Sequence, residues 1–191
     1  MLSIIAIADD DALVGHIEPD ADIDLLLSLG DLYDVTLEKA IDIYAPEHVV
    51  AIRGNHCVAT AFPVLTVDLH LQTVERFGLT LGGFAGSWQY KRLGNHMYTQ
   101  EQVNELLDDF PAVDVFIAHN SPRGIHERDS VNHQGFDAFL DYIDRVQPHK
   151  RQLKVKYIKS GWYTVLIYLI VSANLPPRLV VPAMADDVDA P

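Results

Sequence analysis

The sequence predicts an α/β fold in a single domain that spans residues 1–191. Short apolar runs typical of buried strands alternate with segments of helical spacing, which is the pattern of an α/β layered fold. Each apolar run stops abruptly at polar residues. The chain has 191 residues, 49% of them hydrophobic, so it is long enough to bury one complete core.

Four apolar runs predict strands that are buried on both faces. Leu2–Ala8 is continuous and rich in isoleucine, and it stops at Asp9. The other three runs are Ile23–Leu29, His48–Ile52 and Val113–Ala118. Each run leads into a loop that carries aspartate, asparagine or histidine, so polar side chains are expected at the ends of the strands.

Three segments have the spacing of helices. Thr36–Tyr44 and Thr99–Asp109 begin with threonines that are suitable N-caps, followed early by acidic residues. Gly135–Val146 carries an amphipathic stripe of apolar residues. We therefore expect helices in all three segments, capped in the first two by Thr36 and Thr99.

The middle of the chain predicts an antiparallel pair of strands. Leu65–Leu71 and Leu79–Ala85 are both apolar, and a polar stretch that ends in Gly78 separates them. Such a connection is typical of a hairpin.

Composition limits the classes of function. The formal net charge is −13, which argues against a protein that coats nucleic acid, because that function requires a basic face. An anionic substrate would therefore need a local positive charge, and a bound divalent cation is the obvious source.

The same survey predicts a cytoplasmic protein that does not span a membrane. Cys57 is the single cysteine, so no disulfide can form within the chain. No basic residue precedes the first apolar run, which does not fit a signal peptide. The run Trp162–Val171 is about half of the roughly 20 residues that a membrane helix needs.

The character of the chain changes after Pro148. Residues 1–148 contain 24 acidic and 8 basic residues, whereas 149–191 contain 3 acidic and 6 basic residues. Basic side chains cluster in Lys150–Lys159 and precede the late apolar run. We treat 149–191 as an atypical C-terminal segment of the same domain.

The polar residues at the strand ends form one candidate site. Carboxylates, a carboxamide and imidazoles that converge there suit Mn²⁺, Mg²⁺, Fe or Zn²⁺. In two-metal sites a carboxylate commonly bridges the ions, and a shared hydroxide attacks phosphorus in line. Asp31 is central in the set and is the expected bridge. The set consists of Asp9, Asp11, Asp31, Asp34, Asn55, His56 and His119.

The order of these motifs resembles the calcineurin-like metallophosphoesterase family, whose pattern is D-x-H, G-D-x-x-D, G-N-H-D/E, a lone histidine and G-H-x-H. The matching segments are Asp9–Asp11, Gly30–Asp34, Gly54–Cys57 and His119–Pro122. The resemblance covers residues 1 to about 148. It implies two mixed β-sheets packed as a sandwich with flanking helices, and hydrolysis of a phosphomonoester or phosphodiester by a metal-bound hydroxide.

The resemblance also implies a role for each residue. Asp9 and Asp31 would hold the first of two divalent ions, and Asp31, Asn55 and His119 the second. His56 would lie beside the scissile phosphate of a small-molecule substrate. The further implied residues are Asp11 as a metal ligand, Asp34 as the acceptor that orients His56, and Arg53 and His133 as phosphate contacts.

Three positions depart from the family pattern. Asp11 stands where the family has histidine, although a carboxylate can still bind a hard cation. Cys57 replaces the acid after the motif histidine. No G-H-x-H follows residue 135, so the ligands that complete both metal spheres in the family are absent there. Divergence and an altered reading frame would both produce this last departure. The missing ligands could also come from a second subunit, or from His126, His133 or His149.

Three hypotheses of function therefore stand. The first is a metal-dependent phosphoesterase. The second is a catalytically impaired member of the family that acts as a binding or scaffold module. The third is an interaction module that docks an acidic partner through Lys150–Lys159. The substrate, the metal identity and the oligomeric state are not encoded in any motif.

Overall fold

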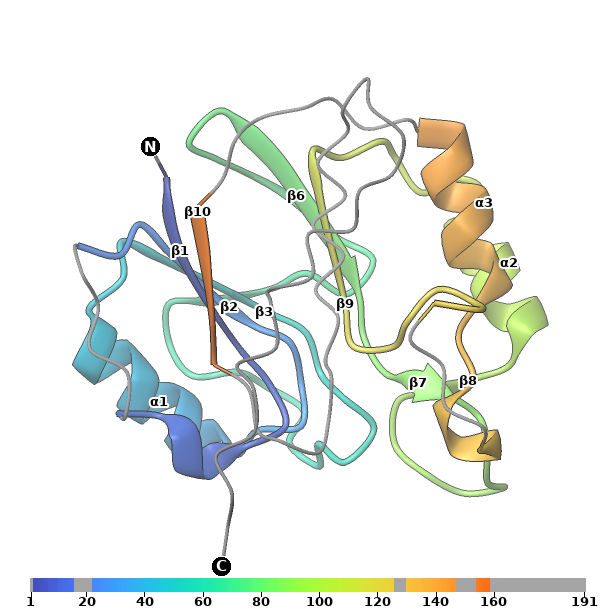
Figure 1. The fold of residues 1–191 in the computed structure, drawn as a ribbon, viewed down its shortest axis with the longest axis horizontal. Coiled ribbons are helices and arrows are strands. Elements are labelled where there is room, and N and C mark those ends of the chain that lie inside the picture. Colours follow the sequence, from blue (N-terminus) through green and yellow to red (C-terminus); the bar gives the residue numbers. More distant parts are fainter. Residues whose placement is uncertain (1, 16–21, 126–129, 147–153, 159–191) are drawn as a thin grey trace, which may run out of the picture.

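The computed structural model describes residues 2–15, 22–125, 130–146 and the backbone of 154–158. Figure 1 shows β-strands in the middle of the molecule, with α1 (Asp34–Tyr44) on one side and α2 (Gln100–Asp108) and α3 (Asp137–Val146) on the other. The α/β class predicted from the sequence is confirmed in these residues.

The larger sheet has five strands in the order β10-β1-β2-β3-β4. Every pairing in it is parallel, so this sheet is not mixed as the resemblance implied. Parallel neighbours cannot be joined by a tight hairpin, so the chain must cross back between them, as it does through α1 between β2 and β3. Its strands are β1 (Ser3–Ile7), β2 (Leu25–Ser28), β3 (His48–Ala51), β4 (Thr66–Asp68) and β10 (Lys154–Ile158).

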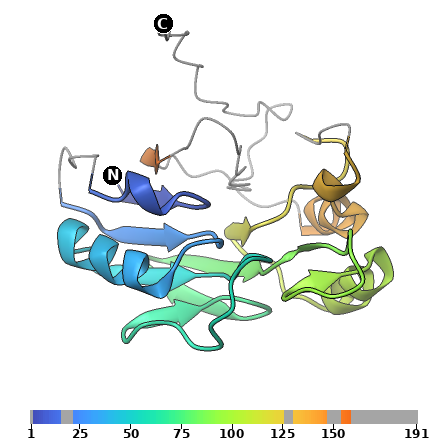
Figure 2. The ribbon, with the colours of Figure 1, turned by 90° about the horizontal axis from the view of Figure 1, so that it is seen from below.

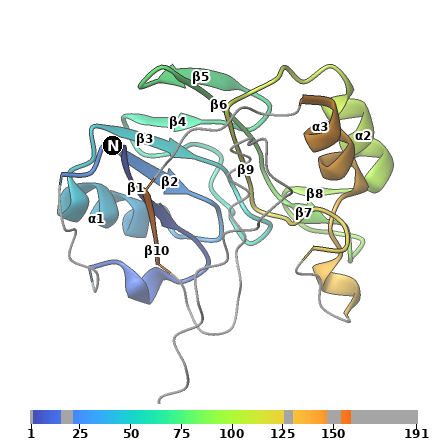
Figure 3. The same ribbon diagram turned by 45° about the horizontal axis from the view of Figure 1, so that its top comes forward.

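A second sheet has the order β5-β6-β9 and is mixed. β5 (Thr73–Arg76) pairs antiparallel with β6 (Leu79–Phe84), and β6 pairs parallel with β9 (Val115–Ala118). Figure 3 shows the β5–β6 hairpin at the top of the view. A third, two-stranded sheet joins β7 (Ser87–Trp88) to β8 (Met97–Tyr98) in parallel.

An antiparallel pair is present in the middle of the chain, but its first strand is not the predicted Leu65–Leu71 segment. The stretch read as a connection forms β5, and the hairpin turns at Phe77 and Gly78, whose φ angles are 54° and 67°. Positive φ at both turn residues is the geometry of a tight hairpin. The apolar segment before it supplies β4, which joins the larger sheet instead.

In the part of the chain that the structure describes, three helices flank the sheets, and only one of the two predicted threonine caps is present. α1 spans Asp34–Tyr44, α2 spans Gln100–Asp108 and α3 spans Asp137–Val146. Thr99 caps α2 through a complete capping box, as predicted. Thr36 does not cap α1, because the helix begins two residues earlier and Thr36 is buried inside it.

The buried side chains form three clusters that correspond to layers. One contains apolar residues of both larger sheets, such as Leu27 and Ile117, so the two sheets share a core. A second joins the other face of the five-stranded sheet to α1 through Leu37 and Tyr44. A third packs the mixed sheet against α2 and α3, and Figure 2 shows these helices away from α1.

The C-terminal predictions are only partly covered by the structure. β10 comes from the basic segment Lys150–Lys159 and lies parallel to β1. The apolar run Trp162–Val171, and the residues after β10 where a G-H-x-H motif would stand, lie outside the described residues. Among the described helices, none has the length and apolar character needed to cross a bilayer.

Candidate metal site

The parallel register gathers the polar strand ends at one edge of the five-stranded sheet. Ile7 pairs with Ser28, and Ser28 pairs with Ala51, so β1, β2 and β3 end side by side. The loops after parallel strands are the usual place for a site in such sheets. The loop after β9 brings His119 to the same place from the mixed sheet.

Three of the predicted residues converge on one point. Asp9, Asp31 and His119 each offer a ligand atom, and these atoms lie within 4.8 Å of one another. His119 Nε2 lies 3.3 Å from Asp31 Oδ2. Two carboxylates and one imidazole form a donor set that suits a divalent transition metal.

The backbone holds both carboxylates in an unusual conformation. Asp9 and Asp31 have φ angles of 62° and 54°, in the left-handed region that aspartate adopts more readily than most residues. The Asp9 amide donates to the Gly30 carbonyl at 3.2 Å, which links the two loops. Backbone strain of this kind is concentrated at functional sites.

Two glycines allow the loops to approach this closely. A Cβ at Gly30 would lie 2.7 Å from Gly54 Cα and 2.8 Å from His119 Nδ1. A Cβ at Gly54 would collide with the Asp31 carboxylate and lie 2.7 Å from His119 Cε1. Any larger side chain at Gly54 would therefore displace the central carboxylate.

Hydrogen bonds fix His119 with one ring nitrogen facing Asp31. Nδ1 donates to the Leu29 carbonyl at 2.8 Å, which leaves Nε2 toward the carboxylates. A backbone carbonyl on the other ring nitrogen is the arrangement that orients metal-binding histidines.

The electrostatics of the cluster follow from burial and close charges. Burial raises the pKa of Asp9 to about 6, and the Asp31 charge adds to the increase. Burial acts to lower the pKa of His119, but the hydrogen bond and charge of Asp31, with the charge of Asp9, raise it to about 9. Burial acts to raise the pKa of Asp31, yet His119 and the His56 amide hold it below its usual value.

One atom of the cluster fits a metal ligand particularly well. Asp9 Oδ2 is buried and has no hydrogen-bond partner among the described residues. A buried carboxylate oxygen without a partner is costly unless a ligand or ion satisfies it. The trio therefore fits a divalent cation both by donor chemistry and by this unpaired oxygen.

Asn55 and His56 lie on the turn that follows β3. The Asn55 amide nitrogen donates to the Tyr90 hydroxyl at 3.3 Å, so its side-chain oxygen is the atom left with ligand chemistry. The His56 backbone amide donates to Asp31 Oδ1 at 2.8 Å. The His56 side chain is exposed, and its charge acts on the pKa of both Asp9 and Asp31.

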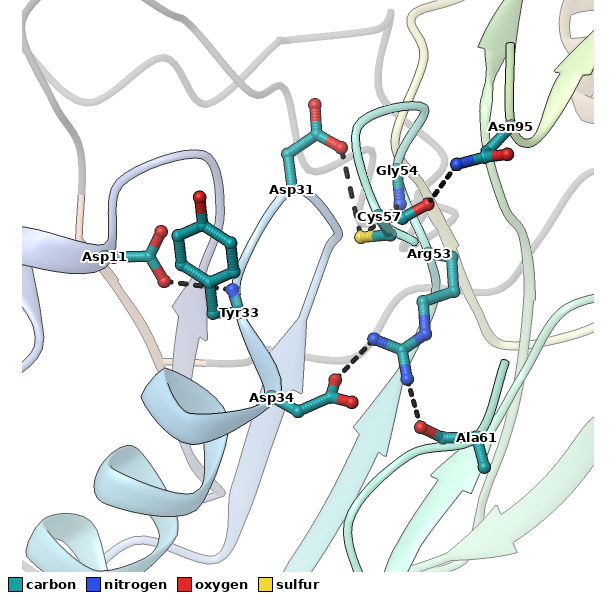
Figure 4. Close-up of polar contacts among 9 residues, drawn as sticks. All are labelled: Asp11, Asp31, Tyr33, Asp34, Arg53, Gly54, Cys57, Ala61 and Asn95. Atoms are coloured by element: carbon teal, nitrogen blue, oxygen red, sulfur yellow. Dashed lines mark hydrogen bonds and ion pairs between the residues drawn. The ribbon is translucent and has the colours of Figure 1, made fainter. Parts of the chain in front are cut away.

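Asp11 is not brought into the cluster. Asp10 caps the short 3-10 helix Asp11–Leu13 by accepting from the Ala12 amide, which turns the chain away after Asp9. Asp11 Oδ1 accepts instead from the Tyr33 amide at 3.0 Å. Figure 4 shows this contact to one side of the Asp31 carboxylate.

Arg53 and Asp34 are paired with each other in the structure. Arg53 Nη1 lies 2.6 Å from Asp34 Oδ1, Nη2 donates to the Ala61 carbonyl, and the guanidinium lies over the Phe62 ring (Figure 4). Arg53 is only 5% exposed, and its role as a phosphate contact stays a prediction. Asp34 Oδ1 anchors Arg53, and the role of Asp34 in orienting His56 likewise stays a prediction.

His133 has only a local contact in the structure. It ends the 3-10 helix Val131–His133, and its Nδ1 is hydrogen bonded to the Ser130 hydroxyl. No contact described for it reaches the trio, so its role as a phosphate contact stays a prediction.

Cys57 occupies a supporting position behind Asp31. Its Sγ lies 4.0 Å from Asp31 Oδ1 and accepts a hydrogen bond from the Gly54 amide at 3.4 Å. Figure 4 shows the sulfur between the Gly54 turn and the carboxylate. The thiol thus packs where the resemblance implied an acid.

Sequence reasoning missed the contribution of residues 86–98. Tyr90 binds Asn55, and the Asn95 amide donates to the Cys57 carbonyl at 3.1 Å. These residues follow no motif spacing.

Comparison with protein families gives the same answer as the motifs. The model of the calcineurin-like phosphoesterase family matches residues 6–164. The chain belongs to the calcineurin-like phosphoesterase family. The match includes β10 and extends past it, and a search of curated proteins finds no match.

Proposed function

We propose that this chain is a metal-dependent phosphoesterase that hydrolyses a small-molecule phosphomonoester or phosphodiester. The observation that carries the proposal is the convergence of Asp9, Asp31 and His119, with ligand atoms within 4.8 Å, in a member of a phosphoesterase family. Asn55 completes the proposed ligand set through its side-chain oxygen. Asp11, half-buried and bound to the Tyr33 amide, is left out of this set.

The proposed cofactor is one or two divalent ions, with Mn²⁺, Mg²⁺, Fe and Zn²⁺ as the candidates. When bound, such ions would supply Lewis acidity and an activated water. Asp9, Asp31 and His119 would hold the first ion, and Asn55 with a carboxylate oxygen of the same trio would hold a second.

The remaining roles fall to residues of this chain. His56 is the proposed catalytic side chain, which would stabilise charge on the phosphate or protonate the leaving oxygen. Its backbone amide keeps the Asp31 carboxylate in orientation. The Arg53–Asp34 ion pair fixes the β3 loop relative to the start of α1, and so positions the turn that carries Asn55 and His56.

The alternative function is that of a catalytically impaired binding module. It is favoured by the sequence after residue 135, which contains no G-H-x-H motif. A cytoplasmic location, a single domain and the absence of nucleic-acid coating remain parts of the proposal, supported by the single cysteine and by the acidic composition.

Metal content and turnover test these alternatives together. We expect protein purified without chelators to contain Mn, Fe or Zn, and to hydrolyse an aryl phosphate or a bis-aryl phosphodiester with added Mn²⁺. Chelation and the substitution Asp31→Asn should each abolish both properties, whereas Asp11→Asn should retain the metal. Bound metal without any turnover would support the binding module, and absence of metal from the folded wild-type protein would contradict the proposal.

A further inference from the structure

Residues 86–98 pack against the metal site as one element, which we call the recognition arm. It contains β7, the loop after it and β8. The Gly86 amide donates to the Arg53 carbonyl at 2.7 Å. With the contacts of Tyr90 to Asn55 and of Asn95 to Cys57, the arm is attached at three points to the turn that carries Asn55 and His56.

A backbone hydrogen bond within the arm joins its two ends at Ser87 and His96. The Ser87 amide donates to the His96 carbonyl at 2.9 Å. His96 has a φ of 45°, and Gly86 has a φ of 80° and lies so close to His96 that a Cβ there would collide with its carbonyl. These contacts thus hold the His96 backbone in the left-handed region.

His96 lies within electrostatic range of the metal-binding trio. Burial lowers the pKa of its half-buried imidazole, the charges of Arg53 and His119 add to the decrease, and those of Asp68 and Asp31 oppose it. It is not part of the trio itself, whose ligand atoms come from Asp9, Asp31 and His119. The backbone contacts of Gly86 with Arg53 and of Ser87 with His96 place His96 beside the turn that carries Asn55 and His56.

The tip of the arm carries two exposed cations. Lys91 and Arg92 follow Tyr90 directly, and Lys91 Nζ lies 5.2 Å from the centre of the Tyr90 ring. They stand out in residues 1–148, which contain 24 acidic and only 8 basic residues. Figure 4 shows Asn95, at the other end of this loop, on the opposite side of the Cys57 turn from Asp11.

We propose that the recognition arm selects phosphate esters that carry a second anionic group, such as a nucleoside bisphosphate. His96 contacts the phosphoryl group at the metal site, and Lys91 with Arg92 binds the second anionic group. The inference rests on the proposed function, since it places the substrate phosphate at Asp9, Asp31 and His119. Charge-assisted hydrogen bonds to phosphate are strong enough to discriminate between ligands that differ by one such group.

Binding of two nucleotides to the full-length, Mn²⁺-loaded protein tests this inference. The probes are adenosine 5′-monophosphate and adenosine 3′,5′-bisphosphate, which contain the same nucleoside and differ by one phosphate group. We expect the bisphosphate to bind the wild-type protein about 10-fold more tightly. The double variant Lys91→Gln/Arg92→Gln should remove this difference and leave monophosphate binding unchanged.

The variant His96→Asn should weaken binding of both probes by about 10-fold while metal content is retained. Asparagine tolerates the left-handed backbone, so this change removes the imidazole with little effect on folding. The matched control is Lys39→Gln/Arg76→Gln, which removes one charge from α1 and one from β5. It should change the affinity for neither nucleotide.

Three results would overturn the inference. They are equal affinity of the wild-type protein for both probes, an equal loss of bisphosphate affinity in the control, and unchanged binding in His96→Asn. A wild-type protein that binds neither metal nor the monophosphate contradicts the proposed function itself, so the two failures are distinguishable.

Discussion

Two groups of charged residues meet at the carboxyl edge of the five-stranded sheet, and they differ in the source of the positive charge. In one group Arg53 pairs with Asp34, and arginine is always charged in proteins. In the other, His119 pairs with Asp31, and histidine can give up its proton. A metal ion can therefore replace the proton in the second group but cannot displace the cation of the first.

This difference separates a structural ion pair from a candidate metal site. Both groups derive from the same motifs, which contain Asp31, Asp34 and Arg53 within a few residues of the strand ends. Arg53 is anchored further by Ala61 and Phe62, although its Nε, like Asp9 Oδ2, is buried without a hydrogen-bond partner among the described residues. The ability of the cation to give up its proton, rather than the presence of an ion pair, therefore identifies the candidate metal site.

The largest effect on metal affinity is expected from replacing His119, the cation that can give up its proton. His119→Gln removes an imidazole ligand but keeps a side chain that can donate to the Leu29 carbonyl. Metal affinity should fall more than about 100-fold, because even changes to residues behind the ligands cost about 10- to 100-fold. Titration with Mn²⁺ or Zn²⁺ against a competing chelator measures this.

The matched control is His48→Gln, at the start of β3 and thus at the other end of the strand. It should bind metal like the wild-type protein. An equal loss of affinity in both variants would mean that His119 is not a ligand, and the comparison between the two groups would fail.

Replacing Arg53, which is always charged, should lower the free energy of unfolding and leave metal binding in place. Arg53→Met leaves the Asp34 carboxylate without its partner. Breaking a buried ion pair costs about 3–5 kcal/mol, and the 31% exposure of the Asp34 side chain reduces the expected loss to about 2 kcal/mol. Urea unfolding of the metal-free protein measures it.

Arg92→Met, at an exposed position, should change the free energy of unfolding by less than about 0.5 kcal/mol. The folded Arg53→Met variant should still bind metal. If it unfolds at the wild-type urea concentration, the Arg53–Asp34 pair is not the structural group that we describe.

The two groups should also differ in the dependence of metal binding on pH. Burial raises the pKa of Asp9 to about 6, and Asp31 raises that of His119 to about 9 against the effect of burial. Both groups must lose a proton to bind a cation, so metal affinity should rise with pH until both are deprotonated.

At pH 7.5, between the two pKa values, we expect about one proton to be released per ion, mainly from His119. Calorimetry in buffers of different ionisation enthalpy counts these protons. The His119–Asp31 pair should stabilise the metal-free protein below the ordinary pKa of histidine, and this contribution should be lost as pH rises through about 9. Affinity that does not vary from pH 6 to 9 would contradict a site that contains His119.

The sequence by itself determined the α/β class, the strands that end in polar loops, and the family. Buried parallel strands need continuous apolar runs, and these are visible without a structure. Asp9, Asp31 and His119 were predictable because each lies within two residues of the end of such a run, and the parallel register then brings the ends together. Thr99 was predictable as a cap because its contacts are local in the chain.

Only the tertiary structure decided which of the motif residues face one another. Asp11 and Asp34 look like ligands or catalytic residues in sequence, yet their side chains contact Tyr33 and Arg53. The recognition arm likewise depends on contacts between positions about 35 to 40 residues apart, such as Asn55 with Tyr90 and Cys57 with Asn95. Local propensity carries no information about such pairs, because they are set by how the strands and loops pack in three dimensions.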